Sequence, residues 1–567
     1  MTKKINRKSL YIYLLLGFFL ILGFLLRSVY LEENPPGLNW DEASVGYNAY
    51  SLSQTGRDEF GKPWPIYMEA FGEYKIGLYS MFLAPIIRLF GLSIFTVRFP
   101  NVIFGCLLIL ASYYLALQIF KKKLHAGLVA GLIAISPWAI HTSRIALEWY
   151  FGMPLLVFGL AFLLKSRKKV NYLLPASLFL SASLYSYHNL RLFLPLFLLS
   201  YTLIYRQTLI KQKKWVLASL LAAIFMLVPL FISMKSTDFL SRAKAVSILH
   251  DENLQSQLME GIYRHNKAKL PFIRAFNNKL VFYGKETLDR YLAHFSPGFL
   301  FSGEDVTPRI GIEKVGKLYY ASIPFLILGL VELIGKKRRL YKLLLLWLLL
   351  APLSSSFTLD TPHALRSFIL VPPLQIITIL GMIKAYQYLR VKRSLLQVFV
   401  IGIVLLAYLT GFLYFLWRYF LFYPEDSAGS WQTGHQQMVE VLNQHQDQFD
   451  KIIITTHYGQ PHIFVAFFTP IDPQFYQQEV SKDDQKQIFN ERVPHLGKIQ
   501  FRQINNQDFC LSSTLVIIEK GGNINVPASL PKLDVIRYNN RFHEPEVIFE
   551  FYDTNNPEIQ TAFCSSD

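Results

Sequence analysis

Two adjacent acidic residues, Asp41 and Glu42, follow the first apolar stretch of the chain. A carboxylate that takes a proton from a hydroxyl can serve as a general base, and cations can stabilise a departing phosphate. The candidate cations are Lys75, Arg366 and Arg309, because arginine binds phosphate through paired hydrogen bonds and lysine binds it as a point charge. These residue types fit the transfer of a sugar from a phosphate leaving group to a hydroxyl.

The same residues also have ordinary structural interpretations. Two adjacent acids in a loop are typical of a solvated turn or a helix N-cap, and Trp40 beside them is equally an interfacial anchor. Lys75 and Arg366 stand near the ends of apolar stretches, where a long basic side chain reaches toward lipid headgroups. Taken one at a time, these residues therefore leave both interpretations open.

Three further residues are candidates for a supporting role: Glu73, Glu148 and His363. Glu148 fits either a place in the site or an ion pair with Arg144, and His363 fits either the site or a structural role. No histidine pair has metal-ligand spacing, so a divalent metal would have to be held by the acids of the first loop together with Glu148.

The composition places these residues in a membrane protein. Of the 567 residues 52% are hydrophobic and 15% are aromatic, and several apolar runs reach the length of a bilayer. The net charge of +18 comes from basic residues in short loops between apolar runs, not from one basic patch with interleaved aromatics. Nucleic acid is therefore not expected as a partner.

The apolar runs predict eleven membrane spans. A basic start without a small-residue cleavage site indicates an uncleaved first span with a cytoplasmic N-terminus. The expected spans are, roughly, 10–26, 95–120, 124–140, 150–164, 172–187, 190–205, 215–232, 317–334, 340–353, 367–388 and 395–420. The segment 76–90 is short and contains Pro85, so we expect a helix lying along the outer interface.

This order of spans puts every strongly basic loop on the cytoplasmic side, as the positive-inside bias requires. The loops are 121–123, 165–169, 206–214, 336–339 and 390–393. An odd number of spans places the C-terminus outside. The candidate site residues gather where spans meet the outer surface, and charged residues are nearly absent from mid-span, which favours a surface reaction over a path through the membrane.

The sequence divides into two predicted domains. Residues 1–422 form the transmembrane domain, with a first external loop at 27–94 and a large external loop at 234–316. Residues 423–567 turn polar and contain short β-rich runs, which predicts an external soluble α/β domain. Cys510 and Cys564 both lie in this domain, and whether they pair is open.

Several motifs, taken in order, resemble the GT-C superfamily of membrane glycosyltransferases that use polyprenyl-phosphate-linked sugars. The likeness is to the bacterial branch akin to protein O-mannosyltransferases and aminoarabinose transferase, a glycosyltransferase family 39-like group. It covers roughly residues 10–420 and rests on Asn39-Trp40-Asp41-Glu42, Glu73-Tyr74-Lys75, Arg88-Leu89-Phe90-Gly91, Val97-Arg98-Phe99-Pro100-Asn101, Ser136-Pro137, Ser143-Arg144-Ile145-Ala146-Leu147-Glu148 and Pro362-His363-Ala364-Leu365-Arg366-Ser367 with Pro372-Pro373.

The resemblance implies roles for individual residues. Asp41 matches the general base of an inverting transfer, and Lys75 and Arg366 match contacts to the carrier phosphate. Glu148 falls where relatives carry an acidic residue, usually Asp, that in some of them binds a metal. No cofactor is required by this reading, although a divalent metal is compatible with it. Glu in place of Asp, and the residue that separates Glu73 from Lys75, both depart from the family pattern.

The expected partners are a polyprenyl-phosphate-linked sugar, membrane lipid, and an acceptor that is a lipid, a protein or a cell-wall glycan. The expected location is the cell membrane, with the C-terminal domain extracytoplasmic. Two other classes remain open. A lipid-linked oligosaccharide polymerase or ligase is typified by arginines in a late external loop, which Arg309 and Arg366 fit. A flippase is typified by mid-span polar residues or repeats, neither of which is found here.

Overall fold

The computed structural model describes residues 7–233, 246–268, 275, 277–305, 307–390, 394–481, 493–522, 524–540 and 542–564. The chain forms two compact units. The helical unit comprises Met1–Val29, Asn101–Arg144 and Glu148–Leu421, and the mixed unit comprises Tyr30–Pro100, Ile145–Leu147 and Phe422–Asp567. The first external loop thus belongs with the C-terminal segment, whereas the predicted division at 422 joins that loop to the transmembrane domain.

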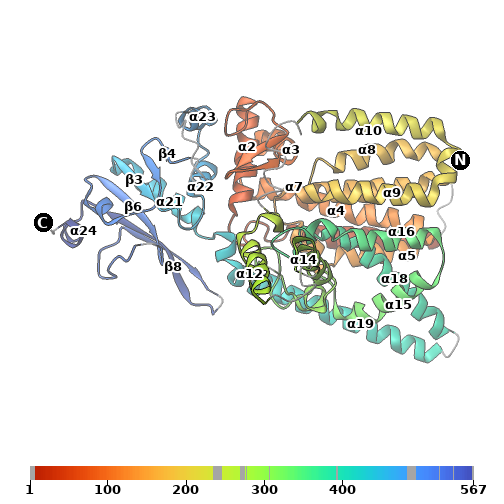
Figure 1. Ribbon diagram of the computed structural model, residues 1–567. Helices are drawn as coiled ribbons and strands as arrows, with labels where there is room; N and C mark the ends of the chain where they lie inside the picture. Colours follow the sequence, from red (N-terminus) through yellow and green to blue (C-terminus); the bar gives the residue numbers. More distant parts are fainter. Residues whose placement is uncertain are drawn as a thin grey trace. The chain divides into compact units, whose positions relative to one another are not determined.

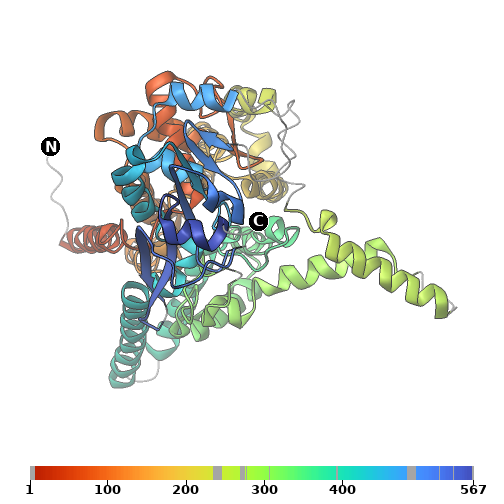
Figure 2. The same ribbon diagram turned by 90° about the vertical axis from the view of Figure 1, so that its left-hand side faces the viewer.

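The helical unit is a bundle of apolar helices that run side by side (Figure 1). Its principal helices are α1 (Arg7–Ser28), α4 (Ile94–Phe120, entered from the mixed unit), α5 (Lys123–Ala134), α6 (Pro137–Thr142), α7 (Glu148–Ser166), α8 (Leu173–Ser183), α9 (His188–Ile210), α10 (Lys213–Ser233), α15 (Ile323–Gly335), α16 (Arg339–Leu350), α17 (Leu353–Ser356), α18 (Val371–Arg390) and α19 (Ser394–Trp417). The amphipathic helices α12 (Glu252–Ala268) and α14 (Lys279–Ala293) project sideways from the bundle in Figure 2.

Seven helices among the described residues are long and apolar enough to cross a membrane: 10–28, 94–120, 148–166, 188–210, 213–233, 368–389 and 395–427. They confirm seven of the eleven predicted spans, and the protein is a multi-pass membrane protein. The other four predicted spans contain α5, α8, α15 and α16, which have 12, 11, 13 and 12 residues. A helix of 12 residues is about 18 Å long, less than the bilayer core of about 30 Å, so these four stay predictions.

Small residues let two of these helices approach closely. A Cβ atom on Gly329 of α15 would lie 2.0 Å from the carbonyl oxygen of Ile377 in α18, and one on Gly381 of α18 would lie 1.8 Å from that of Phe325. Without a hydrophobic driving force in lipid, helices associate through such close backbone packing. Among the predicted cytoplasmic basic residues, Lys3, Lys4, Lys392 and Arg393 lie outside the described residues.

The mixed unit begins with α2 (Trp40–Thr55), a hairpin of β1 (Tyr67–Ala70) and β2 (Glu73–Ile76), and α3 (Leu78–Phe90). The segment predicted as an interfacial helix is helical from Leu78 onward. Tyr79, Leu83 and Ile87 recur every four residues and are buried, whereas Leu89 and Phe90 are 78% and 76% exposed. This division is typical of an amphipathic helix, and its place at the membrane surface stays a prediction.

The C-terminal segment folds around a six-stranded sheet with the order β4-β5-β3-β6-β8-β7. The strands are β3 (Lys451–Ile454), β4 (His495–Leu496), β5 (Ile499–Phe501), β6 (Thr514–Glu519), β7 (Asp534–Asn539) and β8 (Pro545–Asp553); the helices are α20 (Tyr423–Ser427), α21 (His435–His445), α22 (Pro461–Phe468), α23 (Pro473–Ser481) and α24 (Pro557–Cys564). β3 pairs in parallel with β5 and β6, and the other pairs are antiparallel. The predicted α/β class of this segment is confirmed.

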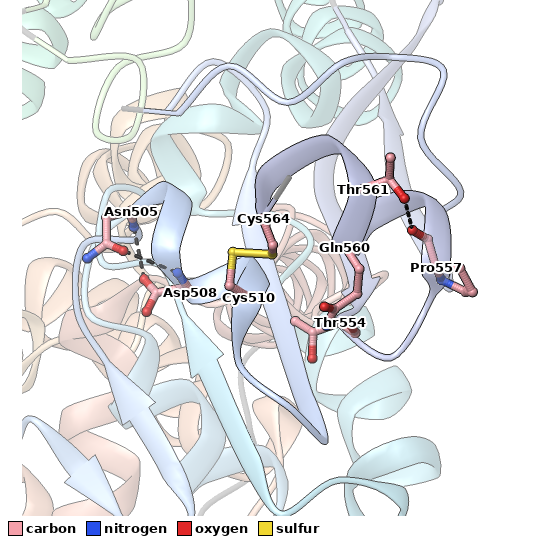
Figure 3. The surroundings of a disulfide bond; sticks show 8 residues. All are labelled: Asn505, Asp508, Cys510, Thr554, Pro557, Gln560, Thr561 and Cys564. Carbon is pink, nitrogen blue, oxygen red and sulfur yellow. Dashed lines mark hydrogen bonds between the residues drawn. A yellow bond between two sulfur atoms is a disulfide. The ribbon is translucent and has the colours of Figure 1, made fainter. Parts of the chain in front are cut away.

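Cys510 and Cys564 form a disulfide in the C-terminal segment (Figure 3). Cys510 ends a short 3-10 helix that Asn505 and Asp508 cap, and Cys564 ends α24. The bond ties these two ends together beside a core that includes Phe509, Tyr552 and Phe563. The pairing that the sequence left open is therefore present.

Candidate active site

The two adjacent acids lie in the first turn of α2, in the mixed unit. Asn39 is the N-cap residue, and its side-chain oxygen accepts the backbone N–H of Asp41 at 3.1 Å. The Glu42 carboxylate reaches back to the backbone N–H of Asn39 at 3.4 Å and completes a capping box. Asparagine caps a helix well, and acidic residues are favoured in its first turn because free N–H groups point toward them.

Asp41 is paired with Lys75, the residue predicted to bind phosphate. The Lys75 ammonium donates a hydrogen bond to the Asp41 carboxylate and lies 5.5 Å from the centre of the Phe71 ring. The two side chains are 11% and 19% exposed, so both groups remain accessible from outside. The structure therefore brings the candidate base and one candidate cation together across 34 residues of sequence.

The β1–β2 hairpin positions Lys75. Its two turn residues, Phe71 and Gly72, have positive φ angles of 54° and 78°, the conformation of the tight turns whose twist matches that of the flanking strands. Lys75 pairs with Met68 across the two strands. A rigid hairpin of this kind fixes the direction of the lysine side chain toward α2. Glu73 begins the same strand, opposite Ala70, and is partly exposed.

Glu42 is surrounded quite differently from Asp41. It is fully buried with Arg98, whose Nε and Nη2 donate to the two carboxylate oxygens at 3.0 and 2.8 Å. The same carboxylate accepts the backbone N–H of Ala146 at 2.7 Å. Breaking such a buried pair leaves an uncompensated charge, so these contacts give Glu42 a structural role.

Arg98 connects Glu42 to the segment before α2. Its guanidinium donates to the carbonyl oxygens of Leu31, Pro35 and Gly37 at 3.0, 2.9 and 2.6 Å. In the sequence, Arg98 is recognisable only as part of a motif, without a role of its own. A fully buried arginine is rare without a partner, but a single sequence does not show which residues are buried. The only signal in the sequence was the position of Arg98 at the start of an apolar run.

The remaining candidates belong to the helical unit. The Arg366 guanidinium donates to the Thr358 hydroxyl at 2.9 Å and lies 3.5 Å from the Asp360 carboxylate. Its side chain is 12% exposed. The Asn189 amide holds the Arg366 carbonyl oxygen at 2.6 Å, and this contact fixes the backbone from which the guanidinium extends.

His363 is buried in that unit, and the charges of several cations act on it. Burial lowers the pKa of His363 well below its usual range, and the positive charges of Arg366, Arg309 and Lys317 lower it further. The imidazole is therefore neutral at physiological pH, and its Nδ1 accepts the backbone N–H of Arg366 at 3.4 Å. The structure thus brings the candidates His363, Arg366 and Arg309 together.

Lys317 is one of these cations, and the sequence did not single it out. Its ammonium lies 2.8 Å from the Asp305 carboxylate, and the two side chains are 4% and 2% exposed. The sequence placed Lys317 at the edge of a predicted span, where a snorkelling lysine is expected. Its burial against Asp305 depends on a loop that folds back onto the helices.

Glu148 is the first residue of α7 and is 5% exposed. Four residues earlier, Arg144 donates to the carbonyl oxygens of Leu26 and Val29 at 3.0 and 2.7 Å, and its guanidinium faces the rings of Tyr419 and Phe420. Arg144 therefore ties the end of α1 to the end of α19, a structural task.

The described residues contain no group of three or more His, Cys, Asp or Glu side chains arranged to hold a metal ion. Within the mixed unit, the Asp41 and Glu42 carboxylates are engaged by Lys75 and Arg98. These donors do not fit the oxygen-rich shell that a divalent cation needs.

Comparison with solved structures identifies the fold. ArnT from Cupriavidus metallidurans in the apo state aligns with a TM-score of 0.54 at 10% sequence identity, covering 98% of this chain and 99% of that chain. The same protein bound to undecaprenyl phosphate aligns with a TM-score of 0.51 at 11% identity, covering 97% and 99%. The chain has a GT-C fold.

This GT-C fold confirms the predicted fold class, a helical membrane domain with a small C-terminal α/β segment. At such low identity the likeness extends to the fold alone. No family model matches the sequence, and no curated protein matches it. The roles of the site residues therefore rest on the geometry given above.

Proposed function

We propose that the protein is an inverting glycosyltransferase that moves a sugar from a polyprenyl-phosphate carrier to an acceptor hydroxyl at the outer face of the cell membrane. The observation that carries the proposal is the contact between Asp41 and Lys75. It places a proton acceptor beside a cation for the leaving phosphate, on a chain with a GT-C fold. The donor class is supported by the ArnT structure that contains undecaprenyl phosphate.

Asp41 acts as the base and Lys75 as a phosphate ligand in this mechanism. In the resting site the hydrogen bond between the Lys75 ammonium and the Asp41 carboxylate orients both side chains. The donor phosphate then competes for the ammonium. Asp41 takes the proton of the acceptor hydroxyl while the oxygen of that hydroxyl bonds to the anomeric carbon. At the same time the bond from the anomeric carbon to the phosphate oxygen breaks. Polyprenyl phosphate leaves from the opposite face of the sugar.

Arg366 and Arg309, in the helical unit, are the other proposed ligands of the carrier phosphate. The positive charges of both residues act on the buried His363, as does that of Lys317. Cations fixed before the reaction stabilise the charge that develops on the leaving group. Glu42 holds the first turn of α2 and takes no part in proton transfer. Supporting roles are proposed for Glu73 in the mixed unit and for Glu148 in the helical unit.

The disulfide supports the proposed orientation. Disulfides persist in oxidising compartments and are rare in the cytosol. A bond between Cys510 and Cys564 fits a C-terminal domain outside the membrane and an N-terminus inside. A reporter fused after Asp567 tests this orientation, since a cytoplasmic signal contradicts it. We also propose that this domain contributes to acceptor binding, because the proposed orientation puts it on the outer side of the membrane, where the acceptor is expected.

Mass spectrometry of lipid-linked sugars tests the function. Cells that lack the protein should accumulate a polyprenyl-phosphate sugar and lose one sugar from envelope material. Wild type and the control Glu33→Gln, an exposed acid of the same loop, should restore both, and Asp41→Asn should restore neither. Full complementation by Asp41→Asn would exclude Asp41 as the base and favour a polymerase, ligase or flippase.

A further inference from the structure

We propose that Gln432, in the segment after the last apolar helix, is a positioning residue for Asp41. This inference rests on the function proposed above. It gives the C-terminal segment a task in the reaction beyond acceptor binding: Gln432 fixes the first turn of α2, and the first turn fixes the candidate base.

Gln432 binds the start of α2 through one atom. Its side-chain oxygen accepts the Asn39 amide at 3.0 Å and the backbone N–H of Trp40 at 3.0 Å. The N–H of Trp40 is one of the groups at a helix start that have no partner within the helix. Asn39 in turn accepts the N–H of Asp41, so a single chain of hydrogen bonds runs from Gln432 to the backbone of the candidate base.

The orientation of the Gln432 amide is set by two backbone groups. Its nitrogen donates to the carbonyl oxygen of Tyr458 at 3.1 Å, while its oxygen faces the N–H of Trp40. Turning the amide over would place donor against donor and acceptor against acceptor. The amide is thus held at both ends, and Gln432 links the 458–459 loop to α2.

The backbone of Gln432 adopts an unfavourable conformation to make these contacts. Its φ is +55°, in the left-handed region, and the residue is 5% exposed. A residue with a side chain pays an energetic penalty there that glycine avoids, and such positions gather at functional sites. Gly459 packs tightly against it, since an added Cβ would lie 2.2 Å from the Gln432 nitrogen and 2.7 Å from the Trp40 ring.

The neighbours of Gln432 hold the same turn of α2. Trp431 is fully buried, and its ring faces the guanidinium of Arg98 at 5.6 Å, the residue that grips Glu42. Thr433 donates to the carbonyl oxygen of Pro36 at 3.4 Å. Three consecutive residues of the C-terminal segment therefore contact the start of α2 or the residues that fix it.

The chemical consequence follows from the sensitivity of catalysis to position. A displacement of about 1 Å at a reacting group lowers rate by about 100-fold. Asp41 is the second residue of α2, so a shift of the first turn moves its carboxylate relative to Lys75. Loss of the Gln432 contacts should therefore lower kcat and leave donor binding nearly unchanged.

The test uses the purified full-length protein in detergent, with lipid extract from cells that lack the protein as donor and their envelope fraction as acceptor. Release of polyprenyl phosphate is followed by mass spectrometry. Gln432→Met keeps the volume and removes both hydrogen-bond functions, and we expect kcat to fall about 10- to 100-fold with the apparent KM for the extract within about 3-fold. Gln436→Met is the control, because Gln436 is exposed and its side chain donates to Glu440, one turn along the same helix, at 3.0 Å.

A second variant separates positioning from folding. Gln432→Glu retains an oxygen that accepts from Asn39 and Trp40, so its kcat should exceed that of Gln432→Met. It also brings a negative charge near Asp41, which should move the acid limb of the pH–rate profile to higher pH. If Gln432 were purely structural, kcat would follow the melting temperature in both variants, and Gln432→Glu would recover no activity beyond its gain in stability.

Three results would overturn the inference. The first is wild-type kcat in Gln432→Met. The second is a fall in melting temperature that accounts for the whole loss of activity, with an unmoved pH profile in Gln432→Glu. The third is wild-type turnover in Asp41→Asn, assayed in parallel, which would contradict the proposed function as well. If Asp41→Asn is inactive and Gln432→Met is fully active, only the positioning role of Gln432 is contradicted.

Discussion

At the scale of single residues, two adjacent acids have opposite surroundings. Asp41 is partly exposed and paired with Lys75, whereas Glu42 is fully buried and bound by Arg98 and a backbone N–H. Accessibility separates a group that can meet an acceptor from one that holds a helix in place. The same separation applies to the cations, since Arg98 has no contact with solvent and Lys75 does.

Replacing Lys75 should affect turnover strongly. Lys75→Met removes a cation from the leaving phosphate, and we expect kcat to fall about 100- to 1,000-fold, as for the loss of one transition-state contact. The donor KM should rise because the same charge binds the ground state. Release of polyprenyl phosphate from lipid extract measures both. Lys62→Met, a lysine with 45% side-chain exposure near the hairpin, should behave as wild type.

Glu59 predicts a pH dependence of stability. It is buried between α2 and α23, where its carboxylate accepts from Asn48 at 2.8 Å and Tyr476 at 3.4 Å. Burial raises the pKa of Glu59 from 4.5 to about 8. The folded protein thus keeps a proton that the unfolded chain releases, and the free energy of unfolding should fall by about 1.4 kcal/mol per pH unit between about pH 4.5 and 8.

Thermal unfolding of the detergent-solubilised protein at pH 6 and pH 9 measures this effect. Glu59→Gln should weaken the pH dependence and be more stable than wild type at pH 9, because an amide carries no charge to bury. The exposed Glu33→Gln should keep the wild-type slope. Equal pH slopes in wild type and Glu59→Gln would contradict the assignment.

At the scale of elements, the β1–β2 hairpin and α2 together set the distance between the proposed base, Asp41, and the proposed phosphate ligand, Lys75. The hairpin depends on a turn whose two residues have positive φ, and α2 depends on a cap made by Asn39. Neither element is long. Their precision comes from backbone geometry and from the buried Glu42–Arg98 pair beneath the first turn of α2.

Gly72 tests the part played by the hairpin turn. An added Cβ at Gly72 meets no atom within 4 Å, so the effect of Gly72→Ala comes from its φ of +78° alone. We expect a loss of about 1 kcal/mol and a several-fold lower kcat, because Lys75 is displaced. Gly61 has a φ of +81° and equal space, so Gly61→Ala should have a similar effect on stability with unchanged kcat. Equal kcat values in Gly72→Ala and Gly61→Ala would show that the hairpin turn does not position Lys75.

At the scale of the whole molecule, the units defined by contacts cut across the sequence. The mixed unit is built from three separate stretches, 30–100, 145–147 and 422–567. The C-terminal segment therefore completes a unit that begins near the first apolar helix. This organisation explains why a residue such as Gln432 contacts Asn39, which precedes it by 393 positions.

The disulfide should stabilise this unit measurably. Cys510 and Cys564 are 54 residues apart. In the loop-entropy model, closing a loop of that length lowers the conformational entropy of the unfolded chain and so raises the free energy of unfolding by about 4 kcal/mol. The double variant Cys510→Ala/Cys564→Ala should unfold at a lower temperature, and reductant should lower the wild-type value toward it. Mass spectrometry after alkylation of unreduced protein should find neither cysteine alkylated, because both are held in the disulfide. Alkylated Cys510 and Cys564 in protein from the cell envelope would contradict the pairing and its proposed location.

The sequence by itself determined what depends on local pattern. Long apolar runs and their basic flanks predicted seven spans that the structure confirms, because burial of twenty apolar residues in lipid needs no knowledge of neighbours. The acids after the first run were typical of either a solvated turn or a helix N-cap, and the structure places them in the first turn of α2, with Asn39 as the cap. The ordered motifs also indicated the fold, which the comparison with ArnT confirms.

The tertiary structure alone decided which groups meet. Asp41 and Glu42 are equivalent in the sequence, and only long-range contacts distinguish them: Lys75 lies 34 positions from Asp41, and Arg98 lies 56 positions from Glu42. The hydrogen bond from the Trp40 backbone to Gln432 likewise joins distant segments, 392 positions apart. A local pattern fixes where a helix begins, but the partner of a charged side chain is set by how the whole chain packs around it.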